Sequence, residues 1–255
     1  MPTGPRAVGD FCWINVLTPE PAAAQPFFRA VLGWEFRELP GMGHIITVDG
    51  HDVGGMWDLH APSTPPGTPA GIGVMIRVAD ADAIAARAVA LGGKATPPFD
   101  IGPNGRMGEI TDPTGAMIDI WQPAAQPGMT ADPTRHGVPS WIEAMVRDAE
   151  RAAAFYAELF GWTRSTMQAV PGMDYIVFRN GEAMVAGLMQ MTPDMPFPPH
   201  WGTYITVDDV DATVATAMAH GGTTTFAPHD IPGVGRIAGI ASPGGVHFSV
   251  MRYSS

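Results

Sequence analysis

Apolar and polar positions along the first half of the chain follow an order of strand, helix and several strands. Residues 11–17 mix apolar and aromatic side chains, as a covered strand does. The next segment places apolar residues on one helical face, and we expect Thr18 to cap this helix, Pro19 to begin it and Gly33 to end it. Strand-like runs follow at 34–39, 44–48 and 53–59.

A second unit of the same kind follows. A strand at 72–78 leads to a helix that Asp80 would cap and Gly92 would end, and strands at 96–99, 107–111 and 117–122 complete the unit. The second half of the chain repeats both units, with caps and stops at Asp148, Asp209, Gly161 and Gly221. The pattern therefore predicts an α+β protein made of four βαβββ units.

The two halves of the chain are copies of each other. Trp13, Gly33 and Trp34 recur as Trp141, Gly161 and Trp162, a shift of 128 residues. Later signatures recur at shifts of 129 and 130, so the copies differ by short loop insertions. We expect one domain at 7–124, a linker at 125–137 and a second domain at 138–253, each enclosing a cavity between curved mixed sheets.

Composition and charge narrow the class of partner. The chain is 45% hydrophobic and 15% charged, and its net charge is −11. A chain with so few cations has no electrostatic footprint for nucleic acid or for an anionic membrane. A single cysteine, Cys12, excludes an internal disulfide and a four-cysteine zinc site. No run has the length of a signal peptide or a membrane span, so we expect a cytoplasmic protein with a small-molecule ligand.

The repeated motifs carry a resemblance that covers nearly the whole chain. The chain resembles the vicinal oxygen chelate superfamily, which includes glyoxalases, bleomycin-resistance proteins and extradiol dioxygenases. Its tandem form resembles an actinobacterial subgroup labelled glyoxalase or hydroxylase. The motifs are Phe27-Phe28 with Leu32-Gly33-Trp34, Phe155-Tyr156 with Phe160-Gly161-Trp162, Val78 to Asp82, Val207 to Asp211, and the turns Asp112-Pro113-Thr114-Gly115 and Ser242-Pro243-Gly244-Gly245.

The resemblance implies three metal-ligand positions in each copy, which face the cavity. They are occupied by Trp13, Gly73 and Asp119 in the first copy, and by Trp141, Gly202 and Ser249 in the second. A catalytic divalent ion needs about three protein ligands. We therefore expect no metal and no cofactor. A relocated site is the remaining alternative, built from His44, His51, His60 and His247.

Strand alternation predicts which side chains line each cavity. Glu143 and His247, both in the second copy, are the candidate acid and base. Arg106 and Arg236 either bind an anionic group or hold turns. The alternative for Glu143 is an ion pair with Arg77 or another arginine, or a backbone bond. Core packing is the alternative for the aromatic and Met residues. The candidate substrate-binding residues are Trp13, Asn15, Met75, Arg77, Asp119, Trp121, Trp141, Met145, Tyr204, Thr206, Ser249 and Met251.

Four functions fit these residues. The first is a metal-free protein that binds a partly apolar metabolite or antibiotic-like ligand for resistance or sequestration. The second is a metal-independent lyase, isomerase or hydroxylase-like enzyme using Glu143 and His247. The third is a metal-dependent glyoxalase or dioxygenase with displaced ligands, and the fourth is a structural partner with an exposed apolar patch. We expect a monomer with an internal pseudo-dimer, or a homodimer, in which the second copy does the work.

Overall fold

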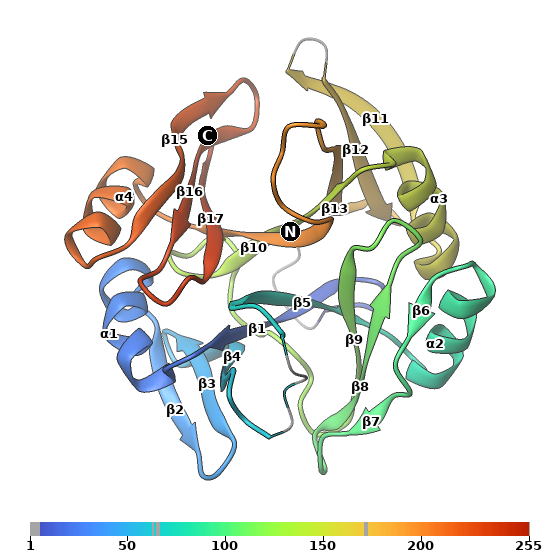
Figure 1. Cartoon of the computed structure of the whole chain (residues 1–255), viewed down its shortest axis with the longest axis horizontal. Helices are drawn as coiled ribbons and strands as arrows, with labels where there is room; N and C mark the ends of the chain where they lie inside the picture. The colour runs from blue at the N-terminus through green and yellow to red at the C-terminus, as the bar shows by residue number, and fades with distance from the viewer. Residues whose placement is uncertain (1–5, 63, 65–66, 171–172, 255) are drawn as a thin grey trace. The chain divides into compact units, whose positions relative to one another are not determined.

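The computed structural model describes residues 6–62, 64, 67–170 and 173–254, and its order of elements follows the predicted units (Figure 1). The first copy contains β1 (Phe11–Thr18), α1 (Pro21–Leu32), β2 (Glu35–Leu39), β3 (Gly43–Val48), β4 (His51–Asp58), β5 (Gly71–Arg77), α2 (Ala81–Ala90), β6 (Lys94–Ala95), β7 (Phe99–Asp100), β8 (Gly105–Thr111) and β9 (Met117–Pro123). The second contains β10 (Pro139–Val146), α3 (Ala149–Phe160), β11 (Thr163–Val170), β12 (Met173–Asn180), β13 (Ala183–Gln190), β14 (His200–Thr206), α4 (Val210–Ala219), β15 (Thr223–Ile231), β16 (Gly235–Ala241) and β17 (His247–Tyr253).

Each βαβββ module forms a mixed four-stranded arrangement with one helix. The orders are β2-β3-β4-β1, β5-β9-β8-β6, β11-β12-β13-β10 and β14-β17-β16-β15, with β7 paired to β8. In every module the first strand runs parallel to the last, and the remaining pairs are antiparallel. The sheets do not close into barrels, and the predicted α+β class with paired βαβββ units is confirmed.

Most predicted helix signals act as expected. The side chains of Asp80, Asp148 and Asp209 accept hydrogen bonds from backbone N–H groups three residues on, at 2.9, 3.1 and 3.0 Å. Gly33 and Gly161 end α1 and α3 with φ values of 66° and 72°, the left-handed region that favours glycine. These local signals therefore define the starts of three helices and the ends of two.

Two predicted boundaries are wrong. Thr18 does not cap α1, because β1 continues through Thr18, whose carbonyl accepts a hydrogen bond from the N–H of Leu59. The helix begins at Pro21 after an N-cap at Glu20 that makes no side-chain bond. The strand expected at 96–99 is only the short β6 and β7, because the intervening prolines have no N–H to donate.

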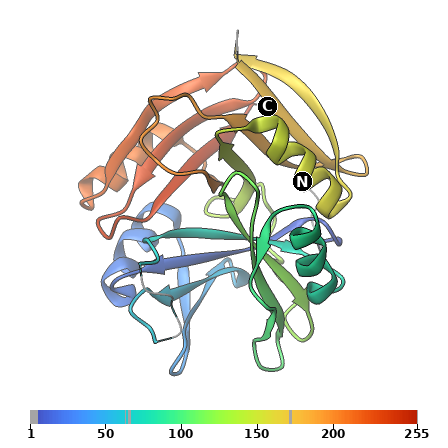
Figure 2. The same ribbon diagram turned by 45° about the vertical axis from the view of Figure 1, so that its right-hand side comes forward.

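Two compact units arise by pairing modules from different copies. Unit 1 contains the N-terminal segment through Cys12 together with Val74–Gly128 and Trp141–Gly202. Unit 2 contains Trp13–Gly73, Met129–Ser140 and the segment from Thr203 onward. Helix α2 packs beside α3 within unit 1, and α1 beside α4 within unit 2 (Figures 1 and 2). Each unit therefore contains one module from each copy, joined through helices.

Two equivalent tryptophans make reciprocal bonds between the copies. The indole of Trp34, directly after α1, donates to the carbonyl of Gly137 at 2.7 Å, just before β10. The indole of Trp162, directly after α3, donates to the carbonyl of Gly9 at 2.9 Å, just before β1. Both bonds are buried, so each repeated Trp anchors the beginning of the other copy.

Among the described residues, no helix is long and apolar enough to cross a membrane.

Candidate functional site

Strand alternation places the predicted site residues on the face of each module opposite its helix, which we call the helix-free face. Alternate residues such as Ile14, Val16 and Ile120 are fully buried, as expected for the helix side. Most site candidates are buried or half-buried, whereas His247 is exposed at the start of β17. The helix-free faces are therefore aromatic and Met-rich, with a few polar groups.

In β1, the structure links Asn15 to an aromatic residue that the sequence reasoning did not select. The indole of Trp57 in β4 donates to Asn15 Oδ1 at 2.9 Å. A Cβ added to Gly43 or Gly55 would overlap the Trp57 ring, so these two glycines make room for the indole. Trp13 is buried on the same strand. In the first copy, the Asn15 Oδ1 atom therefore already accepts a hydrogen bond from the Trp57 indole.

In β9, Asp119 lies opposite a second carboxylate that the sequence reasoning also missed. Antiparallel pairing places Glu109 of β8 directly across from Asp119, while Met75 of β5 is the partner of Asp119 on the other side. Directly opposed residues share a face. Burial raises the pKa of Glu109. This row therefore combines two carboxylates with a methionine.

In β10, the corresponding face has a different set of residues. The indole of Trp141 donates to the hydroxyl oxygen of Tyr175 in β12 at 2.9 Å. Glu143 is only 7% exposed and lies opposite Gly187 of β13. A Cβ on Gly187 would overlap the outer end of the Tyr175 ring. In the second copy, the Tyr175 hydroxyl therefore lies over Gly187, the register partner of Glu143.

The remaining face of the second copy carries less polar chemistry. Tyr204 of β14 pairs with Ser249 of β17, which pairs with Gly239 of β16. Met251, two residues after Ser249 on β17, is buried. His247 belongs to unit 2 and Glu143 to unit 1, so their joint action as acid and base stays a prediction.

Three candidate ligand contacts are bonded to the linker. Arg77 Nη1 donates to the carbonyl of Pro127 at 2.8 Å, and the indole of Trp121 donates to the carbonyl of Gln126 at 3.0 Å. At the position equivalent to Arg77, Thr206 Oγ1 donates to the carbonyl of Pro133 at 2.7 Å. These side chains therefore help to hold the linker, and a ligand contact by any of them stays a prediction.

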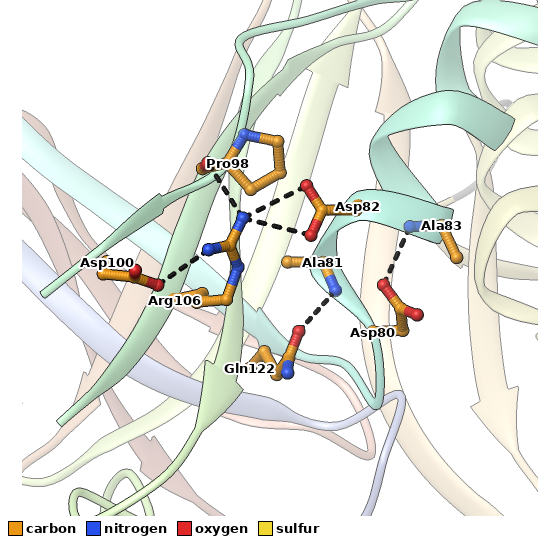
Figure 3. A network of polar contacts seen from close by, with 8 residues as sticks. All are labelled: Asp80, Ala81, Asp82, Ala83, Pro98, Asp100, Arg106 and Gln122. Atoms are coloured by element: carbon orange, nitrogen blue, oxygen red, sulfur yellow. Dashed lines mark hydrogen bonds and ion pairs between the residues drawn. The ribbon is translucent and has the colours of Figure 1, made fainter. Parts of the chain in front are cut away.

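The two repeated turn arginines hold structural ion pairs. Arg106 bonds Asp82 at the start of α2 and Asp100 on the neighbouring strand, with distances of 3.0 and 2.7 Å (Figure 3). Arg236 bonds Asp211 and Asp230 in the same way, at 2.6 and 3.1 Å. Each guanidinium is thus bound to two carboxylates, which favours the structural interpretation of these arginines over anion binding.

Two further features do not carry a ligand site. Cys12 is fully buried, and burial raises the pKa of its thiol, which disfavours a nucleophilic role. A mostly apolar pocket of about 250 Å³ lies in unit 1 between Val8, Arg77, the first turn of α2 and Phe160. This volume is below the roughly 300–1,000 Å³ of typical ligand pockets.

Of the six residues at the metal positions of the resembled family, only Asp119 carries a carboxylate, so neither copy supplies the three ligands that a metal ion needs. Trp13 and Trp141 carry indole N–H donors, which cannot ligate, and the Trp141 N–H is already bonded to Tyr175. Gly73 and Gly202 have no side chain. Across the described part of the chain, no three His, Cys, Asp or Glu side chains come together as a metal site, and this includes the histidines of a relocated site.

Comparisons with known proteins agree with this fold. A family model described as "Glyoxalase/Bleomycin resistance protein/Dioxygenase superfamily" matches residues 11–120 and 139–250. CFP32 of Mycobacterium bovis, whose name describes it provisionally as a glyoxylase, is 38% identical over 94% of this chain and 93% of its own length. The anthracycline biosynthesis protein DnrV of Streptomyces peucetius is 31% identical over 96% of this chain and 94% of its own.

Solved structures show the same architecture at low identity. The Mn(II)-bound glyoxalase from Novosphingobium aromaticivorans has a TM-score of 0.67 at 15% identity, covering 96% of this chain and 82% of its own. The 2,3-dioxygenase LapB from Pseudomonas sp. KL28 has a TM-score of 0.63 at 14% identity, covering 98% and 96%. The chain therefore belongs to the glyoxalase, bleomycin-resistance and dioxygenase superfamily, as two tandem copies of its domain.

Proposed function

We propose that this chain is a metal-independent member of the superfamily that binds a small, partly apolar metabolite in a cavity lined by the helix-free face of β10–β13, in the second copy. One observation carries the proposal. At the family's first ligand position in the second copy, Trp141 bonds Tyr175, and the buried Glu143 lies two residues further along the same strand. An aromatic and Met-rich surface with a few polar groups suits such a ligand.

The relatives suggest the first ligands to test. The names of DnrV and DauV from Streptomyces place those proteins in anthracycline biosynthesis. We therefore propose aromatic polyketides as the first class of ligand, in a resistance or sequestration role within the cytoplasm. A neutral probe, 2-(hydroxymethyl)anthraquinone, represents the flat ring system of this class without adding a charge.

The test compares equivalent positions in the two copies. Glu143→Gln keeps the side-chain shape but removes the charge, and hydrogen bonds to charged groups contribute about 1.5–3 kcal/mol. We expect this variant to bind the probe at least about tenfold more weakly in a calorimetric titration. Asn15→Ala, at the equivalent position of the first copy, should change the affinity by less than about threefold. Equal losses from the two variants would contradict a specialised second copy.

Metal analysis tests the other half of the proposal. We expect untagged protein, purified without chelator and incubated with iron, manganese, nickel and zinc, to contain far less than one equivalent of metal by elemental mass spectrometry. Probe affinity should also be unchanged by EDTA. Stoichiometric metal with chelator-sensitive activity would favour glyoxalase or dioxygenase chemistry with displaced ligands instead.

A second candidate function rests on the burial of Glu143. A carboxylate that is 7% exposed among Met and aromatic residues suits proton transfer as well as binding. In that case the chain is a metal-independent lyase, isomerase or hydroxylase-like enzyme, with Glu143 as the proposed acid or base. Mass spectrometry of the recovered ligand separates the two functions: an unchanged mass and retention time supports binding, and a changed product that Glu143→Gln abolishes supports catalysis.

A further inference from the structure

His200 begins β14 on the helix-free face, two residues before Gly202. Alternation gives this orientation, because the intervening Trp201 faces the helix side, where its indole donates to the hydroxyl oxygen of Tyr156 in α3. His200 is half-buried and belongs to unit 1, as Glu143 does. The second copy therefore carries an imidazole in the same compact unit as its buried carboxylate.

One ring nitrogen of His200 is already bonded. Nδ1 lies 2.9 Å from the carbonyl oxygen of Pro198, and a carbonyl only accepts, so Nδ1 carries the hydrogen. In a neutral imidazole the other nitrogen, Nε2, is then an acceptor. Phe197 packs at right angles to the ring, and the His200 ring makes no further hydrogen bond within the described part of the chain. The ring is therefore held as an acceptor of fixed orientation.

The segment that leads into β14 is itself anchored. Arg147, directly after β10, donates to three of its backbone carbonyl oxygens at 2.8 to 3.2 Å, those of Thr192, Met195 and Phe197. The equivalent position in the first copy is Pro19, which has no donor. The guanidinium of Arg147 thus fixes the approach of the chain to His200 in the second copy.

The sheet leaves an open place over Gly202, beside His200. A Cβ added at Gly202 would meet only the backbone oxygen of Glu143, at 4.0 Å, among the described atoms. At Gly187, on the other side of Glu143, the ring of Tyr175 fills the corresponding place. Two residues of a strand cover about 7 Å, so a ligand that covers Gly202 reaches the His200 ring.

A second histidine of the chain has the same local contacts as His200. The sequence Phe-x-Pro-His recurs at 226–229, where His229 Nδ1 also contacts the carbonyl oxygen two residues earlier, at 3.0 Å, and Phe226 again packs edge-on. His229 is exposed on β15, the last strand of its sheet. The local motif therefore accounts for the orientation of the ring, whereas the place over Gly202 lies beside His200.

We propose that His200 is the specificity-determining residue of the second copy's site, and that its Nε2 accepts a hydrogen bond from a hydroxyl group of a planar ligand whose ring covers Gly202. The ligand class is thus an aromatic ring system with an alcohol or phenol at its edge. This inference rests on the proposed function, because it names a contact at the end of the same site, where β14 begins beside β10.

Two neutral probes isolate the hydroxyl. The first is 2-(hydroxymethyl)anthraquinone, and the second is 2-methylanthraquinone, which has the same rings and carbonyls but no hydroxyl. Both are titrated into the unmodified full-length protein, into His200→Phe and into His229→Phe. Phenylalanine keeps an aromatic ring without a nitrogen acceptor, and His229 supplies the matched control because its ring has the same local contacts.

The expected result is a loss that depends on the probe. One neutral hydrogen bond is removed, so His200→Phe should weaken binding of 2-(hydroxymethyl)anthraquinone by about threefold to tenfold. The affinity for 2-methylanthraquinone should change by less than about twofold. His229→Phe should change neither affinity.

A second pair of variants tests the place over Gly202. Neither Gly202 nor Gly71, the equivalent of His200 in the first copy, has a positive φ, and a Cβ has room at both. Gly202→Val should keep the melting temperature of the unmodified protein but weaken both probes by at least about tenfold, because its side chain takes the place of the ring. Gly71→Val should change neither affinity.

NMR tests the tautomer of His200 without a ligand. Long-range proton–nitrogen correlation at pH 8, assigned by the signals that His200→Phe removes, should show the hydrogen on Nδ1 and none on Nε2. A hydrogen on Nε2 would overturn the proposal, because that nitrogen could then not accept.

Each contrary binding result has one meaning. If the unmodified protein binds both probes and His200→Phe weakens them equally, or weakens neither, the role of His200 is overturned and the proposed function stands. The same conclusion follows if the unmodified protein prefers 2-methylanthraquinone, if His229→Phe causes the selective loss instead, or if Gly202→Val leaves both affinities unchanged. If the unmodified protein binds neither probe, the planar ligand class fails and this inference falls with it.

Discussion

Tyr156→Phe is the sharpest test of how the modules of unit 1 are joined. Tyr156 of α3 is fully buried, and its hydroxyl oxygen accepts a bond from the indole of Trp201 at 2.8 Å. Burial and the neighbouring Asp112 carboxylate raise the pKa of Tyr156 well above its ordinary value. Asp112 is itself 3% exposed and lies in the turn between β8 and β9. The hydroxyl thus lies between a buried donor and a buried carboxylate from different copies.

The expected loss of unfolding free energy follows from the polar groups that the Tyr156 hydroxyl contacts. Each buried polar group that loses its partner costs about 1–3 kcal/mol. Trp201 loses its acceptor, and the buried Asp112 carboxylate loses the neighbouring hydroxyl. We therefore expect Tyr156→Phe to lower the free energy of unfolding by about 2–4 kcal/mol. Urea denaturation followed by tryptophan fluorescence measures this change.

Unit 2 supplies the compensating variant. Its equivalent positions hold Phe28 and Ser242, and Ser242 Oγ accepts from the N–H of Val246 at 3.1 Å. Adding Asp112→Ser to Tyr156→Phe copies this pair and removes the carboxylate that would otherwise lie beside a phenyl ring. The double variant should be more stable than the sum of the single losses predicts, by about 1–2 kcal/mol. If the losses of unfolding free energy in the two single variants simply add in the double variant, the reasoning is refuted. In the control, Asp112→Ser combined with Tyr253→Phe, the two losses should add.

The same residue predicts an alkaline loss of stability. Because the folded pKa of Tyr156 lies above the unfolded value of about 10, its contribution is complete below that pH and is lost as the pH rises through the folded pKa. The free energy of unfolding should therefore fall more steeply between about pH 9 and pH 11 in the unmodified protein than in Tyr156→Phe. Burial also raises the pKa of Tyr253, so a smaller alkaline slope should persist in the variant.

Two further predictions concern the backbone conformation at Gly137 and the reactivity of the Cys12 thiol. Gly137→Ala should lower the melting temperature far more than Gly50→Ala, because φ is positive at both positions, at 82° and 77°, but only a Cβ at 137 would overlap the carbonyl of Leu32. Similar scanning-calorimetry shifts for the two variants would contradict this. Cys12 should react with a thiol reagent at pH 8 orders of magnitude more slowly in folded protein than in urea, because burial raises its pKa. Comparable rates would show that the thiol is accessible.

Local signals predicted most of the fold, because the interactions behind them span only a few residues. An Asp side chain that caps three residues ahead, as at Asp80, is readable from its neighbours alone. The start of α1 was predicted wrongly for the opposite reason. Pairing with β4 extends β1 through Thr18, and nothing near Thr18 in the sequence records that long-range hydrogen bond.

Whether a site residue could be predicted depended on how far apart in the sequence its contacts lie. Glu109 could have been found, because counting outward from the turn between β8 and β9 places it opposite Asp119. Tyr175 could not, because its position depends on Gly187 and on Trp141, which lies 34 residues away. The bond from Arg77 to Pro127 likewise requires the path of the linker, which alternation along one strand does not reveal.

Comparison of the copies separates what folding requires from what the site requires. Positions that hold the fold are retained in both, as in the reciprocal bonds of Trp34 and Trp162. The helix-free faces differ instead: the first copy has Asn15 and a Glu109–Asp119 row, and the second has Glu143 and a Gly239–Ser249 row. Folding alone does not require such differences between equivalent faces, because both copies share one module topology and one set of caps. The two faces therefore present different chemistry to a ligand.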